Sequence, residues 1–147
     1  MNLTEHFTLQ EMTFSSTAER RGIHNEPDSI AAANLTATAM GLEQVRALLG
    51  APLHIDSGYR CPALNKAVGG AWNSAHLRGC AADFTCASFG TPQQIVEAIA
   101  SSPIAFDQLI QEGTWVHIAF DPNPRREVLT AHFNGQGVTY TKGVSHA

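Results

Sequence analysis

The spacing of apolar residues changes along this 147-residue chain, and that change limits the folds it can adopt. Before residue 50, apolar side chains recur at steps of three and four from Leu35 to Leu49, which predicts an amphipathic helix that ends at Gly50. From Phe106 onward they alternate with polar side chains, which is typical of strands with one buried face. Helices followed by strands predict an α+β domain, with helices packed on a small antiparallel sheet.

Two shorter helices are predicted near the amino terminus. Thr8 stands three residues before Glu11, and Ser16 stands three residues before Glu19. In this spacing a hydroxyl and a returning carboxylate satisfy the free N–H groups at a helix start. We therefore expect each pair to open a short helix.

Prolines and glycines mark the remaining element boundaries. Pro27 suits the first position of the main helix, and Thr91 with Pro92 opens a later one that ends before Pro103. The broken stretch from residue 59 to 84 predicts a long loop with one helical turn near residues 63–67. The predicted strands are Leu53–Ser57, Phe106–Glu112, Trp115–Phe120 and Glu127–Phe133, with a tight turn at Gly113–Thr114.

Composition favours one globular domain. Apolar residues make up 44% of the chain and charged residues 15%, which excludes a disordered class. Neither a repeat nor a low-complexity tract divides the sequence. We predict a single domain over residues 1–134 and a short C-terminal tail over residues 135–147.

Charge and hydropathy exclude several partners. The formal net charge is −4 and no run of basic residues occurs, which argues against nucleic-acid binding. No apolar run is long enough for membrane insertion, and the first residues lack the pattern of a signal peptide. We expect synthesis in the cytoplasm. A monomer is the default expectation because no heptad pattern occurs. Three cysteines, Cys61, Cys80 and Cys86, are too few for a disulfide framework, and the apolar neighbours of Cys80 and Cys86 indicate buried thiols.

Three of the residues that could carry chemistry have metal-ligand character. His76 and Asp83 lie on either side of Gly79, so a turn there could bring an imidazole and a carboxylate together. His117 is a lone imidazole in an apolar strand, where it needs a polar partner. Two histidines and one carboxylate suit zinc and leave a fourth position open. The alternative is that the three are ordinary hydrogen-bonded core residues. The remaining histidines, His6, His24, His54, His132 and His146, carry no motif.

Three segments carry a family resemblance. Ser74–Asp83, with the pattern S-x-H-x-x-G-x-A-x-D, and the later triplet Trp115–His117 resemble the signature of the zinc D-Ala-D-Ala carboxypeptidase family, which has the hedgehog/DD-peptidase fold. Ser57–Asn65 is similar to a second motif of that family. The segments Phe7–Glu11 and Thr17–Pro27 resemble the branch common in phage lysis proteins. The matched segments lie between residues 6 and 120.

The resemblance implies a set of site residues. Zinc would be held by His76, Asp83 and His117, with a bound water as nucleophile and the peptide stems of bacterial peptidoglycan as substrate. Arg60 would face the substrate as a catalytic and binding residue, since its planar guanidinium suits a carboxylate or a developing oxyanion. Asn65 and Ser74 are predicted to bind substrate as well, although Ser74 could instead stabilise its own loop.

The acid/base residue is where the chain departs from the family pattern. Some branches place an acidic residue three positions before the last histidine, but Thr114 stands there and cannot act as a base. Other branches place it five positions before, where this chain has Glu112. We therefore predict Glu112 as the general acid/base, with Asp107 as the alternative.

Three functional hypotheses follow. The first is a zinc D,D-carboxypeptidase or endopeptidase acting on peptidoglycan stems in phage lysis, reaching the cell wall or periplasm after release from the cytoplasm. The second is an L-Ala–D-Glu endopeptidase endolysin. The third, favoured by Thr114, is a non-catalytic wall-binding or virion module that keeps zinc for stability.

Overall fold

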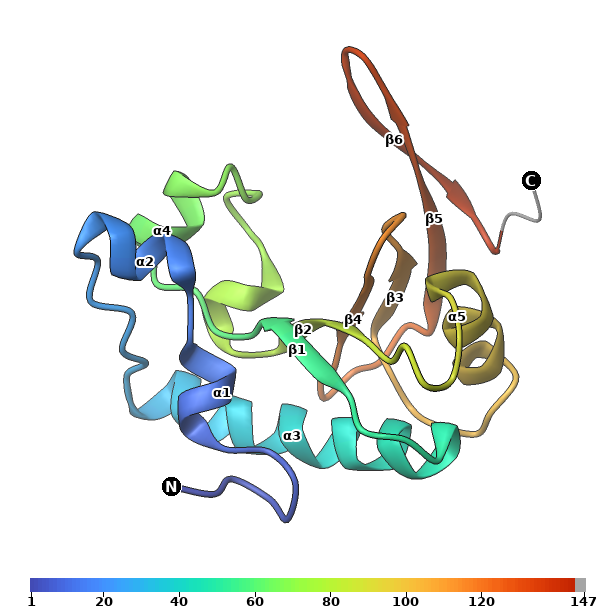
Figure 1. The fold of residues 1–147 in the computed structure, drawn as a ribbon, viewed down its shortest axis with the longest axis horizontal. Helices are drawn as coiled ribbons and strands as arrows, with labels where there is room; N and C mark the ends of the chain where they lie inside the picture. The colour runs from blue at the N-terminus through green and yellow to red at the C-terminus, as the bar shows by residue number, and fades with distance from the viewer. Residues whose placement is uncertain (145–147) are drawn as a thin grey trace.

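The computed structural model describes residues 1–144, so His146 and the end of the predicted tail lie outside the described part. Its six-stranded sheet has the spatial order β1-β2-β4-β3-β5-β6 (Figure 1). The strands are β1 (His54–Ser57), β2 (Ala81–Thr85), β3 (Gln108–Gln111), β4 (Val116–Ala119), β5 (Glu127–Asn134) and β6 (Gly137–Lys142). The helices are α1 (Leu9–Thr13), α2 (Ser16–Arg21), α3 (Ser29–Leu49), α4 (Pro62–Ala67), the 3₁₀ helix η1 (Ala75–Arg78) and α5 (Pro92–Ala100). The predicted α+β class is confirmed.

Strand pairing shows one departure from the expected antiparallel sheet. Within residues 1–144 the neighbouring strands pair antiparallel except β3 and β5, which run parallel. The sheet is therefore mixed. The parallel pair arises because the chain passes from the end of β4 across to the far side of β3 before β5 begins.

Two strands come from segments predicted to be irregular. β2 lies between β1 and β4 and buries Ala82 and Phe84 completely, although the glycine-rich sequence around it indicated a loop. β6 occupies the middle of the predicted tail and pairs along its length with β5. The boundary at residue 134 thus falls inside a hairpin. The domain limits themselves stay a prediction.

The first three helices begin with the predicted kind of capping contact, but α2 and α3 start at residues other than those expected. Thr8 caps α1 by accepting from the Glu11 amide, as predicted. The cap of α2 is Ser15, whose hydroxyl accepts from the Ala18 amide, so Ser16 is the first helical residue instead. Pro27 precedes the cap of α3, because the Asp28 carboxylate takes that position and accepts from the Ala31 amide.

Helix ends and the later helix agree with the expectations. α3 ends at Gly50, which has a left-handed φ of 68° and donates to the Arg46 carbonyl. α5 begins with a reciprocal capping box between Thr91 and Gln94. Both devices satisfy backbone groups that a helix end leaves free.

The core lies between the sheet and the helices α3 and α5. α3 runs beneath the strands in Figure 1, and α5 packs on β3 and β4. Its fully buried side chains include Leu35, Leu42, Phe84, Ile95, Ile99, Phe106 and Ile118. Cys61, Cys80 and Cys86 are buried free thiols, as expected for the last two. None of the helices in residues 1–144 has the length and apolar character that a membrane span needs.

The hairpin of β5 and β6 extends away from the rest of the sheet (Figure 1). Every residue of β6 is exposed, whereas Thr130 and Ala131 near the base of β5 are buried. The part of the hairpin that projects from the sheet, residues 131–140, is called the arm below.

Candidate active site

His76, Asp83 and His117 come together from three elements. His76 lies on η1, Asp83 on β2 and His117 on β4. The Asp83 Oδ1 atom is 3.2 Å from His76 Nε2 and 2.9 Å from His117 Nδ1. One ligand atom from each residue lies within 4.8 Å of the other two. The three residues predicted to bind zinc therefore form one cluster that could hold a metal ion.

Strand register accounts for two members of this cluster. Asp83 and His117 are direct cross-strand partners between β2 and β4, so their side chains project from the same face of the sheet. Their neighbours Ala82 and Ile118 are fully buried on the opposite face, against the core. Alternation along a strand thus separates the polar cluster from the apolar core.

A turn at Gly79 returns the chain over β2 and so places His76. Gly79 has a left-handed φ of 75°, and a Cβ there would lie 2.6 Å from the Ala31 carbonyl oxygen of α3. Glycine is needed on both counts. Ser74 caps η1 by accepting from the His76 amide at 3.2 Å, and it also lines the cleft described below.

The His76 ring is oriented by a backbone contact behind it. Nδ1 lies 2.6 Å from the Gly58 carbonyl oxygen, so the ring donates from Nδ1 and keeps the Nε2 lone pair for a ligand. Burial lowers the pKa of His76, and the opposing effect of Asp83 is smaller. A neutral imidazole is the form that binds metal.

Asp83 supplies the negative charge. Burial alone would raise the pKa of its carboxyl, but the two histidines outweigh burial and hold the pKa well below its ordinary value. Two imidazoles and one carboxylate are a donor set that fits zinc, and three protein ligands leave a position for water. The residues present therefore suit the metal that the resemblance implied.

The cluster lies in a cleft of about 680 Å³. Its lining includes residues 68–71 and 73–75 together with Glu112, Trp115 and Tyr140. Arg60 and Asp83 line it beside the histidines. A cleft of this size accommodates several residues of an extended peptide or a small ligand.

Glu112 lines this cleft directly after β3. Its amide donates to the Trp115 carbonyl oxygen at 3.0 Å across the turn to β4, which keeps it beside the His117 strand. Burial raises the pKa of Glu112; His117 opposes that rise, and the Asp83 charge adds to it. A half-buried carboxyl with a raised pKa is better suited to accept and return a proton than one at the ordinary value.

Asp107, the alternative acid/base, is committed to another partner. Arg125 donates to it through Nε at 2.8 Å and through Nη2 at 3.0 Å, a bidentate pair. Hydrogen bonds from Arg125 lower the pKa of Asp107, which outweighs the effect of burial. The geometry therefore favours Glu112 over Asp107 as the proton carrier.

Arg60 is held against the cluster from one side. Its Nη2 atom lies 3.9 Å from Asp83 Oδ2, and Nη1 donates to Asn65 Oδ1 at 3.1 Å. Burial lowers the pKa of the Arg60 guanidinium, while the Asp83 charge opposes that change. The buried Nε atom has no acceptor among residues 1–144.

Asn65, which is predicted to bind substrate, lies behind Arg60 in the structure. Its side chain is 4% exposed and does not line the cleft. Oδ1 accepts from Arg60, and Nδ2 donates to the Ala71 carbonyl oxygen at 2.9 Å. Asn65 therefore ties Arg60 to the loop of residues 68–74 from behind, because its own amide groups are used within the protein.

Two further residues that hold Arg60 in place were not among the predicted site residues. A Cβ on Gly70 would lie 2.1 Å from Asn65 Oδ1 and 2.6 Å from Arg60 Nη1, so a larger residue there would displace both side chains. Asn25 accepts from the Cys61 amide at 2.8 Å and donates to the Tyr59 carbonyl oxygen at 3.0 Å, which fixes the backbone on both sides of Arg60. The resemblance of the segment that ends at Pro27 was the signal that could have identified Asn25.

Comparison with known proteins gives one result for the family. A family model described as Peptidase M15 matches residues 5–119. The match includes Arg60, Glu112 and the three cluster residues, and it ends with β4. No curated protein matches the chain. The arm lies beyond the matched residues.

Proposed function

Since the chain belongs to the M15 peptidase family, we propose that it is a zinc metallopeptidase that cleaves peptidoglycan stem peptides, as a D,D-carboxypeptidase or endopeptidase. The observation that carries this proposal is that the ligand atoms of His76, Asp83 and His117 lie within 4.8 Å of one another in a cleft shared with Arg60 and Glu112. A role in phage lysis, on the wall after release from the cytoplasm, belongs to the same proposal. It rests on the resemblance of the amino-terminal segments.

The chemistry divides among the residues of the cleft. His76, Asp83 and His117 would hold zinc, which when bound polarises the scissile carbonyl and lowers the pKa of a water. Glu112 takes a proton from the attacking water as the new C–O bond forms. The same carboxyl then returns a proton to the departing amine as the C–N bond breaks. Both transfers use one carboxyl whose pKa is raised by burial.

Arg60 serves the substrate. A guanidinium held by Asn65 at 3.1 Å presents fixed donors to the cleft, and it stabilises negative charge on the carbonyl oxygen or a substrate carboxylate. Its pre-set orientation matters because a donor that is already in place needs no reorganisation in the transition state.

Digestion of purified peptidoglycan tests this proposal. The protein is incubated with zinc and murein at several pH values, and the new termini are identified by mass spectrometry. Release of D-Ala or cleavage of D,D cross-links is the expected result. New D-Glu amino termini would assign the L-Ala–D-Glu endopeptidase activity instead, and unchanged muropeptides at every pH would overturn both.

A non-catalytic zinc module is the second candidate. The observation in its favour is Thr114, which lies exposed in the turn between β3 and β4, where other branches of the family place an acid. The position of Glu112 in the cleft favours a catalytic role over this second candidate. Stoichiometric zinc in untagged protein, measured together with absence of hydrolysis, would favour this module.

A further inference from the structure

The arm has one aromatic and one polar face. Phe133 pairs with Val138, and Tyr140 lies two residues beyond Val138, so the three side chains share a face of the hairpin. The other face carries His132 and Thr139. Such alternation would be ordinary if the apolar face were buried. Here Phe133 is 58% exposed, Tyr140 47% and Val138 41%.

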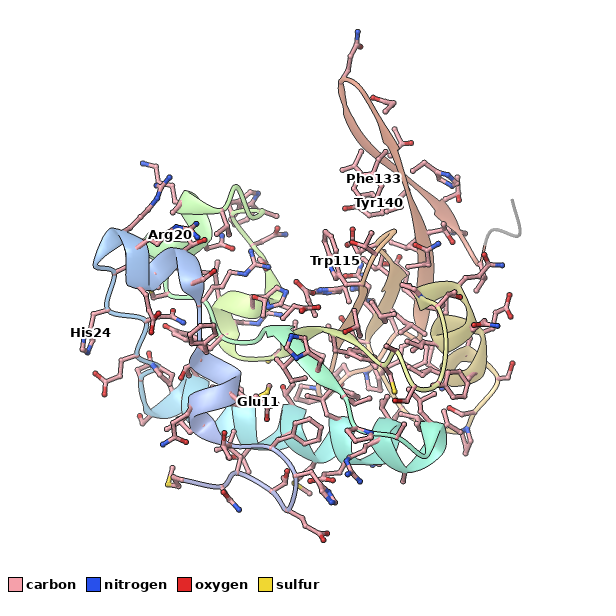
Figure 2. All side chains as sticks on the ribbon, in the orientation of Figure 1. Glu11, Arg20, His24, Trp115, Phe133 and Tyr140 are labelled. Atoms are coloured by element: carbon pink, nitrogen blue, oxygen red, sulfur yellow. The ribbon has the colours of Figure 1, made fainter. Side chains whose placement is uncertain are left out.

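The aromatic face is directed toward the cleft. Tyr140 lines the cleft together with Trp115 and Glu112. The Phe133 ring lies over the turn between β3 and β4, since a Cβ on Gly113 would lie 3.1 Å from Phe133 Cε2. Figure 2 shows Phe133 and Tyr140 on the side of the arm above Trp115. Trp115, Phe133, Val138 and Tyr140, called the aromatic wall below, therefore continue the cleft outward.

The stability of the fold does not explain the aromatic wall, because the side chains on the arm are largely exposed. Exposed aromatic side chains that cluster on one face mark binding surfaces, and tyrosine and tryptophan contribute strongly to such surfaces. The sequence of the hairpin, residues 127–142, has only Glu127 and Lys142 as charged residues, one at each end. An uncharged surface does not suit a phosphate-rich partner.

The size of the wall also limits the occupant. A stable dimer buries about 800 Å² per partner, far more than a few side chains on a narrow hairpin offer. A single pyranose ring matches it better. One face of such a ring presents C–H groups that pack on an aromatic ring, while its hydroxyls remain in water or bond to a tyrosine hydroxyl.

We propose that the aromatic wall binds a sugar ring of the glycan strand to which the stem peptide is attached. This inference rests on the proposed function, because a stem peptide in the cleft carries an amino sugar at its amino-terminal end. Tyr140 belongs to both the wall and the cleft, so a stem bound beside Glu112 can extend to a sugar on the arm. The enzyme would then prefer stems that are still joined to glycan.

Two matched substrates test the proposal. One is a disaccharide-linked muropeptide, and the other is the same stem peptide after an amidase has removed the sugars. For Phe133→Ala with Tyr140→Ala, the ratio of the KM for the linked substrate to the KM for the free peptide should rise about tenfold. Thr139→Ala, on the opposite face of the arm, should leave that ratio as in the wild type. An equal loss on both substrates, or no change on either, would overturn the proposal.

A direct titration separates the two proposals. The isolated disaccharide of peptidoglycan is added to the wild-type protein and to the double variant, and tryptophan fluorescence and NMR shifts of the arm are followed. Saturable binding by the wild type, lost in the double variant, supports the aromatic wall even if no substrate is cleaved. Cleavage without sugar binding would overturn the wall and leave the proposed function standing. Self-association in sedimentation that the double variant abolishes would assign the wall to a second copy and overturn the sugar proposal.

Discussion

In the proposed mechanism, Glu112 is the residue whose substitution distinguishes a peptidase from a non-catalytic metal-binding module. Glu112→Gln keeps the size of the side chain but removes the proton acceptor. We expect hydrolysis to fall by about 10²-fold or more, with zinc content unchanged by elemental analysis. Thr114→Ala, in the exposed turn nearby, is the control and should retain activity. Full activity of Glu112→Gln would remove this residue from the mechanism.

The pH profile provides a second test of Glu112. A general base acts only when ionised, and burial raises the pKa of this carboxyl. Activity should therefore be low while Glu112 is protonated and should rise with pH through a value above the ordinary range for glutamate. The measurement is kcat/KM against pH at saturating zinc. A rise of kcat/KM centred on the unperturbed glutamate pKa, about 4.3, would contradict the assignment.

Asn65 is predicted to act through Arg60 and not on the substrate itself. Asn65→Ala removes the acceptor of Arg60 Nη1 and leaves the Ala71 carbonyl without its donor. A loss of about 1–3 kcal/mol in the free energy of unfolding should accompany a fall in kcat/KM. Urea unfolding and kinetics measure the two effects. Lys66→Ala, at the exposed neighbouring position, should change neither, and a normal Asn65→Ala enzyme would refute the role.

At the scale of elements, the sequence predicted those whose pattern is local. The apolar periodicity of α3 and the glycine that ends it are both visible in the local sequence, so the C-terminal end of this helix is predicted correctly. β2 has only five residues and follows the turn at Gly79, and tertiary pairing with β1 and β4 gives it extended structure. β6 buries none of its residues, so the partner strand, and not a buried face, defines it.

The same distinction holds for the candidate site. Spacing and resemblance brought His76, Asp83 and His117 into one hypothesis, because the glycine turn between His76 and Asp83 is visible in the sequence and the motif supplies His117. The cross-strand pairing of Asp83 with His117 is tertiary and has no local signal. The side on which Asn65 lies depends on how residues 68–74 fold over it, which no local pattern encodes. Tyr140 joins the cleft only through the pairing of β5 with β6.

The turn at Gly79 allows a test with a matched control. Gly79→Ala combines a left-handed φ of 75° with a contact of 2.6 Å to the Ala31 carbonyl oxygen. Gly50→Ala has a similar φ of 68° but meets no atom within 4 Å. In both variants an alanine must adopt a left-handed conformation, which costs about 1–2 kcal/mol in folding free energy. Only Gly79→Ala must also displace the backbone at Ala31. We expect a larger fall in Tm and a loss of zinc for Gly79→Ala; equal effects would contradict the packing argument.

At the scale of the whole molecule, the candidate metal site joins elements that already pack together. Hydrogen-bonding distances link His76 and His117 to Asp83, and α3 and α5 supply a core apart from the site. Chelation should therefore abolish activity and lower Tm while the far-UV circular dichroism spectrum stays the same. Added zinc should restore both properties. Loss of secondary structure on chelation would show that the fold depends on the metal.

The pairing of Asp83 with His117 has a consequence for folding. Side chains alternate along a strand, so a slip of one residue between β2 and β4 would turn His117 into the core and bring Ile118 to the surface. In that misaligned sheet the two histidines would lie on opposite faces, and the metal could not bind both. If the cluster holds zinc as proposed, the metal would stabilise one alignment of the two strands over its neighbours. Metal supplied during refolding would select correctly assembled molecules before any substrate is present.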